Sequence, residues 1–282
     1  MLYLIVSIIL FSLNNILWKK NLEHLSVAFL MANRALFTSI GSLILLFLLN
    51  DFNSFEFSVL CRITLGSVFG VIGLSCMLSV VKKASLQWLG IYNLLGILFA
   101  FMYLWLFEEI DFRKSLLGIF LIILGFLYFI YSNKDSNKIN IDQHLLLLLM
   151  TISFNLSSLI HWKNLTKDIS PIFIISNQEL VVFIAASIRL FYRKRNTQIV
   201  KKSKQNFFKV LAMSIIIFLA LLFSFIGLKT TNPIISSVLF LATPLTTIIF
   251  STIYFKEKLT VKNIFAILII SLGAFILNFI SN

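Results

Sequence analysis

The strongest constraint on this chain is the length of its apolar segments, of which the stretch from Ile234 to Phe255 is the clearest example. It runs for about twenty apolar or small residues, enough helix to cross a bilayer core of roughly 30 Å, and stops at Lys256. Pro244 in its middle frees a backbone carbonyl and predicts a kink or break beside Thr243. A membrane helix that is kinked next to a hydroxyl side chain indicates a cavity.

Similar segments recur along the chain, and the composition excludes a soluble globule. Hydrophobic residues make up 59% of the 282 residues and charged residues only 12%, too few to cover a water-exposed surface. The sequence therefore predicts an all-α integral membrane protein, a multi-pass one with ten transmembrane helices. Their expected bounds are 2–18, 26–49, 59–81, 85–107, 115–132, 143–162, 170–191, 208–228, 233–255 and 262–280.

The net charge of +13 is interpreted as a topology signal rather than as a nucleic-acid surface. The lysines and arginines lie at the ends of apolar runs, without the aromatic interleaving of a single-strand groove, so no nucleic-acid partner is expected. Basic residues at these ends contact anionic lipid headgroups and mark the cytoplasmic side. Most of them fall on one side of the predicted topology, which places both termini outside. The basic interhelical loop at 193–207 supplies much of this excess.

The sequence contains an internal repeat. A shift of roughly 148 positions lays Glu257 on Glu109, and upstream a shift of roughly 144 lays Trp162 on Trp18. The basic loop can absorb the difference between the two shifts. Five predicted helices in each repeat mean that the second repeat enters the membrane from the opposite side, so the repeats are inverted. The two predicted repeats are 1–135 and 143–282.

Arg34 and Glu179 are the charges that the prediction places well inside a span. A charge near the bilayer centre costs at least about 2.5 to 3.5 kcal/mol on insertion scales, so each needs a reason. The repeat shift lays Arg34 on Gln178, next to Glu179, and the two charges could therefore pair across the pseudo-two-fold axis. Two interpretations stay open: a structural ion pair, or a group that binds a charged substrate or, in the case of Glu179, a proton.

Uncharged residues complete the predicted substrate pathway. Ser158 lies at the repeat position of Asn14, and Asn177 at that of Asn33, although hydrogen bonds between helices would explain the asparagines equally well. Tyr92 lies far enough inside its helix to stack on a substrate. The predicted pathway consists of Asn14, Arg34, Tyr92, Ser158, Asn177, Glu179 and Thr243, with a helix break at Pro244.

Trp18, Trp88 and Trp162 lie near predicted helix ends, where tryptophan commonly marks the membrane interface. His161, beside Trp162, is interpreted in the same way, with a pH-sensitive residue of the substrate pathway as the alternative. It has no acidic or cysteine neighbour at ligand spacing, so no metal site is expected, and no sequence feature implies a cofactor.

A recurrent pattern follows the third helix of each repeat. In the second repeat it consists of Lys229-x-x-x-Pro233, Pro244-Leu245, Phe255-Lys256-Glu257-Lys258-Leu259 and Gly273, echoed in the first by Lys83, Phe107-Glu108-Glu109, Gly118 and Gly125. The pattern resembles the EamA repeat of the drug/metabolite transporter superfamily, and Arg34 is similar to an arginine in the second helix of that family. The resemblance implies a ten-helix membrane transporter. It also implies cytoplasmic termini, in disagreement with the charge count.

The sequence departs from the family pattern at two places. Gly96 stands in the first repeat where the second has Pro244. The related four-helix multidrug exporters carry a carboxylate in the middle of the first helix, where this chain has Asn14 and Asn15. Proton-coupled efflux of cationic drugs by that mechanism is therefore not expected.

Inverted repeats around a midplane site are common in secondary transporters. The leading hypothesis is a secondary transporter of small metabolites, amino-acid-like compounds or drugs, working by alternating access as a monomer or homodimer, with proton coupling as an option. A flippase, or a flippase subunit, for a lipid-linked substrate is the alternative. An integral membrane enzyme is less favoured, because no HExxH motif, Gly-rich phosphate loop or cluster of catalytic residue types is present. The Lys-, Asn-, Ile- and Phe-rich composition suggests a bacterial cytoplasmic (inner) membrane.

Overall fold

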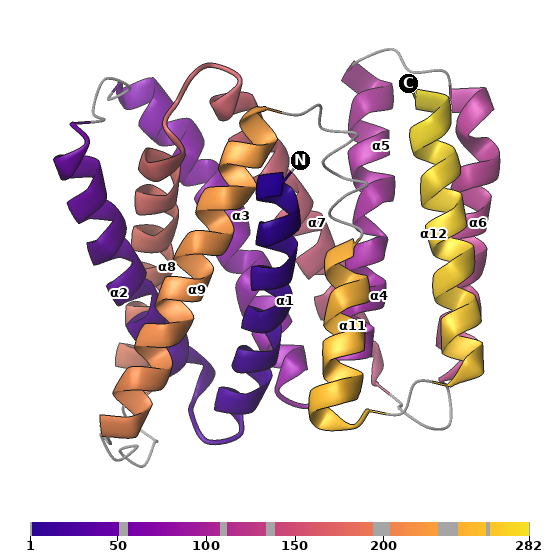
Figure 1. Cartoon of the computed structure of the whole chain (residues 1–282), viewed down its shortest axis with the longest axis horizontal. Coiled ribbons are helices and arrows are strands. Elements are labelled where there is room, and N and C mark those ends of the chain that lie inside the picture. Colours follow the sequence, from indigo (N-terminus) through magenta and orange to yellow (C-terminus); the bar gives the residue numbers. More distant parts are fainter. Residues whose placement is uncertain are drawn as a thin grey trace.

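The computed structural model describes residues 2–50, 56–107, 112–133, 139–193, 204–230, 242–257 and 260–281, and within these ranges every regular element is an α-helix (Figure 1). The helices are α1 (Leu2–Leu22), α2 (Val27–Leu48), α3 (Phe57–Val81), α4 (Leu86–Leu94), α5 (Gly96–Phe107), α6 (Phe112–Ser132), α7 (Ile141–Leu165), α8 (Pro171–Arg193), α9 (Lys204–Lys229), α11 (Ala242–Phe255) and α12 (Val261–Ser281). The predicted all-α fold is confirmed.

The length of the apolar stretch separates the observed helices into two groups. Seven segments of the described chain are long and apolar enough to cross a membrane, and α6, α11 and α12 contain shorter apolar stretches. Because the bilayer core needs about 20 apolar residues per helix, the chain is an integral membrane protein.

One predicted helix is divided in two. The expected helix 85–107 is interrupted at Leu95, between α4 and α5, next to Gly96, and glycine is a poor helix former. Gly96 is the repeat position of Pro244, so the first repeat has an interruption where the sequence indicated one only in the second. The break predicted at Pro244 stays a prediction, since 231–241 lie outside the described residues; α11 begins at Ala242, with Pro244 in its first turn.

The packing of the helices follows the two halves of the chain. Helix α2 packs against α8, and α6 against α12, so each packs against its counterpart in the other repeat. The repeat also matches α1 with α7 and α3 with α9. The contact between α3 and α7 therefore corresponds to the contact between α9 and α1. The start of α1 and the end of α12 lie on the same, upper side of the bundle in Figure 1, as an even number of crossings requires. This arrangement is that of two inverted five-helix repeats.

Small residues bring α6 and α12 together. A Cβ atom added at Gly118 would lie 2.8 Å from the carbonyl oxygen of Gly273, and one added at Gly273 would lie 2.7 Å from that of Gly118. Gly125 lies about two turns further along α6, and a Cβ atom added there would lie 2.9 Å from the carbonyl oxygen of Ala266. Membrane helices associate through such close backbone contact, since lipid supplies no hydrophobic drive between them.

Candidate functional site

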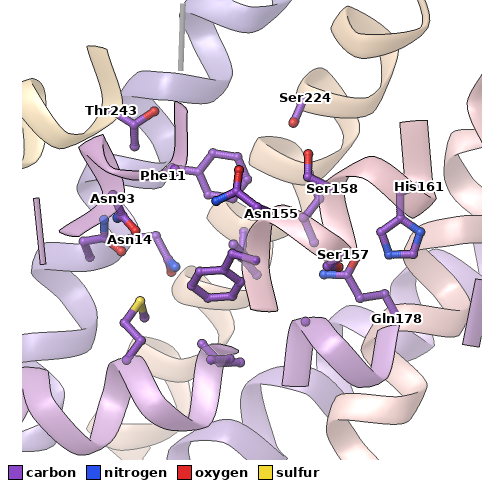
Figure 2. Close-up of a pocket in the computed structure, with 18 of the residues that line it drawn as sticks. Phe11, Asn14, Asn93, Asn155, Ser157, Ser158, His161, Gln178, Ser224 and Thr243 are labelled. Atoms are coloured by element: carbon purple, nitrogen blue, oxygen red, sulfur yellow. The ribbon is translucent and has the colours of Figure 1, made fainter. Parts of the chain in front are cut away.

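A cavity of about 340 Å³ lies between the two halves of the bundle (Figure 2). Its walls come from α1, α2, α3, α4, α5, α7, α8, α9 and α11. Aromatic and aliphatic side chains form part of the lining, among them Phe11, Trp18 and Phe154. The polar lining residues are Asn14, Asn15, Arg34, Asn93, Asn155, Ser157, Ser158, His161, Gln178, Glu179, Ser224 and Thr243. A mainly apolar pocket with a few convergent polar groups is the usual form of a small-molecule site.

Matched positions of the two repeats face this one cavity. Asn14 and its repeat position Ser158 both line it, and so do Arg34 and its repeat position Gln178. Because both members of each pair line the cavity, the cavity lies near the pseudo-two-fold axis that relates the repeats. Secondary transporters with inverted repeats hold their substrates at this place.

The structure brings most of the predicted pathway residues together. Those that line the cavity are Asn14, Arg34, Ser158, Glu179 and Thr243, and Pro244 lines it as well. Tyr92 and Asn177 are not among the lining residues.

Tyr92 is held inside the bundle by contacts with two other helices, α6 and α7. Its side chain is 3% exposed, its hydroxyl lies 2.6 Å from Nδ1 of His144, and its ring meets the edge of Phe126. Thr151 donates a hydrogen bond of 3.0 Å to the Tyr92 carbonyl. These contacts tie α4 to α6 and α7 and place the tyrosine behind the cavity wall.

Asn177 makes hydrogen bonds between helices, one of the two explanations that the sequence left open. Its Oδ1 accepts a bond of 2.9 Å from the Ser67 hydroxyl, and its Nδ2 donates one of 3.0 Å to Oγ1 of Thr64. Both partners belong to α3, so Asn177 joins α8 to α3.

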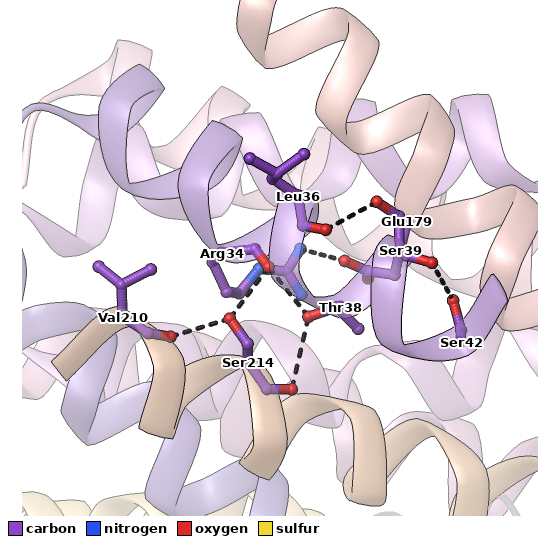
Figure 3. A network of polar contacts seen from close by, with 8 residues as sticks. All are labelled: Arg34, Leu36, Thr38, Ser39, Ser42, Glu179, Val210 and Ser214. Carbon is purple, nitrogen blue, oxygen red and sulfur yellow. Dashed lines mark hydrogen bonds and ion pairs between the residues drawn. The ribbon is translucent and has the colours of Figure 1, made fainter. Parts of the chain in front are cut away.

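Arg34 and Glu179 form the ion pair that the repeat alignment suggested (Figure 3). Nη2 of Arg34 lies 2.9 Å from Oε2 of Glu179, and each side chain is 2% exposed. The guanidinium lies over the ring of Trp18, 5.6 Å from its centroid. Hydroxyl groups of Ser214 and Thr38 donate to the Arg34 carbonyl, each at 3.0 Å. Two opposite charges that neutralise each other leave the described cavity lining without net charge.

His161 was not among the predicted pathway residues, because sequence reasoning favoured the membrane interface over the pathway for it. Helix α7 continues to Leu165, beyond the expected end at residue 162, and the histidine is 1% exposed and lines the cavity. The spacing of Gly66 and Gly70 on α3, which admits α7 closely, was the signal that could have placed it.

The interface interpretation is also wrong for two tryptophans. Trp18 is 1% exposed because it packs beneath Arg34, and Trp88 is 2% exposed because it packs against Phe129 and His144. Helix-end position alone does not distinguish a tryptophan in contact with lipid from one that fills the bundle.

Glu257 joins the lower ends of three helices. It forms an ion pair with Lys19 of α1, and its Oε1 accepts a bond of 3.2 Å from the backbone N–H of Leu86, the first residue of α4. Glu257 itself follows the end of α11 at Phe255. This contact ties the end of α11 to α1 and α4, while its repeat counterpart Glu109 lies outside the described residues.

Within the parts of the chain that the structure describes, no group of three or more His, Cys, Asp or Glu residues could hold a metal ion. The polar groups of the cavity are suited to binding by hydrogen bonds and to carrying a proton.

Comparison with known proteins agrees with this architecture. Residues 143–279 match the model of the EamA-like transporter family, which confirms the family that the sequence pattern indicated. A solved crystal structure, described only as that of a protein, has the same fold, with a TM-score of 0.72 at 13% identity over 99% of this chain and 96% of the other. No curated protein matches the chain. The fold and cavity define an all-α membrane protein of transporter type. The region that matches the EamA-like transporter family, residues 143–279, lies on the second repeat.

Proposed function

We propose that the protein is a secondary transporter that binds a small polar metabolite in the central cavity and moves it by alternating access. The observation that carries this proposal is the cavity itself, which lies between inverted repeats and is lined by amides from both repeats and by hydroxyls from the second. Its volume of about 340 Å³ is in the range of small-molecule sites. Polar groups in mid-bundle favour a water-soluble substrate over a lipid-linked one.

The charges of the cavity narrow the substrate class. Because Arg34 and Glu179 neutralise each other at 2.9 Å, the lining supplies no free charge of either sign among the described residues. Burying a net charge there would require breaking this pair or leaving the new charge unpaired, and both are costly. The preferred substrates are therefore compounds without net charge, amino-acid-like zwitterions included, rather than cationic drugs.

Transport is driven by the substrate gradient or by exchange with protons. Glu179 is the candidate proton site, because it is the carboxylate in the described cavity lining and a carboxyl can carry a proton without moving a side chain far. The functional unit is a monomer or homodimer.

Two features support an assignment of this conformation to one half of the proposed transport cycle. The Lys19–Glu257 pair joins α1 to the segment that follows α11, and we infer that it closes the lower side of the bundle. Lining residues on α9 extend from Ile217 to Leu228, one residue before the helix ends at the upper side. That is a rise of about 16 Å along the helix. We assign the state as one that opens toward the upper side. The lower side carries the larger share of basic residues and is assigned to the cytoplasm of a bacterial inner membrane.

The experiment is a test of access from both sides. Ser158→Cys is made in a chain in which Cys61 and Cys76 are replaced, and a membrane-impermeant thiol reagent is applied to right-side-out and inside-out vesicles. Alternating access predicts reaction from each side. Reaction from one side alone contradicts the proposal, and Ser58→Cys, at an exposed position on α3, is the control for reagent quality.

A further inference from the structure

His161 lines the cavity with both ring nitrogens lacking a hydrogen-bond partner among the described residues, although the side chain is 1% exposed. Buried polar groups are nearly always paired, and an exception at a cavity wall indicates a group kept for a ligand. A neutral imidazole has one donor and one acceptor nitrogen, so it can bind a hydrogen-bond acceptor or a hydrogen-bond donor of a ligand.

The ring is held in place from behind. A Cβ atom added at Gly66 would lie 2.8 Å from Cε1 of His161, and one at Gly70 would lie 3.2 Å from Oγ of Ser157. On the far side the ring contacts that of Phe225, with centroids 5.6 Å apart. The glycine face of α3 therefore seats α7 so closely that His161 and Ser157, one helical turn apart, are fixed toward the cavity.

Ser157 and Gln178 complete one polar end of the cavity. The same hypothetical Cβ at Gly70 lies 3.2 Å from Oγ of Ser157 and 4.0 Å from Nε2 of Gln178, so the two side chains are neighbours. Figure 2 shows them on the side of the cavity where His161 lies. Together the imidazole, hydroxyl and amide present donors and acceptors and no formal charge.

A second polar end lies across the cavity. Asn14, Asn93 and Thr243 lie there in Figure 2, and Oδ1 of Asn14 and Oγ1 of Thr243 are buried without a hydrogen-bond partner among the described residues. Phe11 lies between the two ends in the same view. The cavity therefore matches an elongated, uncharged molecule with hydrogen-bonding groups at both ends and an aromatic surface.

We propose, on the basis of the proposed transport function, that the substrate is nucleoside-like. His161, Gln178 and Ser157 bind the donor–acceptor edge of its heteroaromatic base, and the asparagine and threonine end binds its hydroxyl groups. His161 is then a residue that determines substrate specificity.

The test uses the purified full chain, with equilibrium binding of labelled uridine and adenosine in detergent and counterflow of the same compounds in proteoliposomes. Serine and choline are the comparison compounds. His161→Phe removes the hydrogen bonds and should weaken nucleoside binding at least about tenfold, while His161→Gln, which keeps a donor and an acceptor, should stay within about threefold of the parent. His24→Phe changes an exposed histidine outside the cavity and should leave binding unchanged.

The outcomes separate this inference from the transport proposal. Nucleoside binding that depends on His161, without counterflow, supports the substrate assignment and contradicts the carrier. Counterflow of serine or choline without nucleoside binding overturns the substrate assignment and leaves the carrier standing. Equal nucleoside affinity in His161→Phe and the parent overturns the role of His161. If the phenylalanine variant fails to fold, a loss of nucleoside affinity well beyond about threefold in a folded His161→Gln overturns it instead. Absence of both binding and counterflow overturns both proposals.

Discussion

The Arg34–Glu179 pair makes a quantitative prediction about stability. With 2.9 Å between Nη2 and Oε2 and each side chain 2% exposed, neither charge has solvent to replace its partner. Removing one partner of a buried pair typically costs about 3 to 5 kcal/mol. Glu179→Leu should cost more than Arg34→Met, because the guanidinium left behind stays charged, whereas a carboxyl left behind can take up a proton and become neutral.

The double variant Arg34→Met/Glu179→Leu should be less destabilised than the sum of the two single variants, by at least about 2 kcal/mol, since it leaves no buried charge. The measurement is a double-mutant cycle of unfolding free energies in detergent micelles. Lys229→Met is the control: its pair with Asp168 spans 3.0 Å but the side chains are 38% and 89% exposed, so the change should cost less than about 1 kcal/mol. Additive single effects, or a Glu179→Leu cost no larger than that of the control, would refute the reasoning.

Three further predictions concern packing, closure and coupling. Gly118→Ala should destabilise the protein by at least about 1 kcal/mol, because the new Cβ meets a backbone oxygen, whereas Gly41→Ala, with nothing within 4 Å, should be neutral or stabilising in the same unfolding assay. Lys19→Met should speed the reaction of the introduced cavity thiol from the lower side, because it removes the pair with Glu257; an unchanged rate would contradict the closure. Glu179→Gln, assayed well below its unfolding temperature, should abolish uptake driven by a pH gradient and leave passive exchange, and unchanged gradient-driven uptake would exclude Glu179 as the proton site.

Much of the fold could be predicted from the sequence, because the length of an apolar run and the offset between two repeats can be read directly along the chain. Runs such as Ile234–Phe255 specify membrane spans, and the shift that lays Arg34 on Gln178 anticipated an ion pair with Glu179 that the structure contains. The interruption at Leu95 was not anticipated, because a lone glycine such as Gly96 is as often a packing residue as a helix break.

The cavity lining was harder to predict, because it depends on which face of each helix meets another repeat. Tyr92 and Trp88 lie four residues apart on one short helix, and their partners, His144 among them, come from a distant part of the chain. His161 lies near a helix end in sequence, yet the glycines of α3 allow α7 to pack so that the ring enters the cavity. This packing is recorded in the glycines of α3 and not in the sequence of α7 itself.

The most direct test of the central claim is counterflow in proteoliposomes loaded with unlabelled compound, using labelled amino acids, nucleosides, choline-like cations and cationic dyes, with and without an imposed pH gradient. The parent chain is compared with Ser158→Trp, which fills the cavity, and with Ser58→Trp at an exposed position. A carrier that uses this cavity predicts saturable, trans-stimulated uptake of an uncharged or zwitterionic compound that Ser158→Trp abolishes and Ser58→Trp retains. Uptake that persists in Ser158→Trp, or no counterflow of any compound by the parent, would contradict the account.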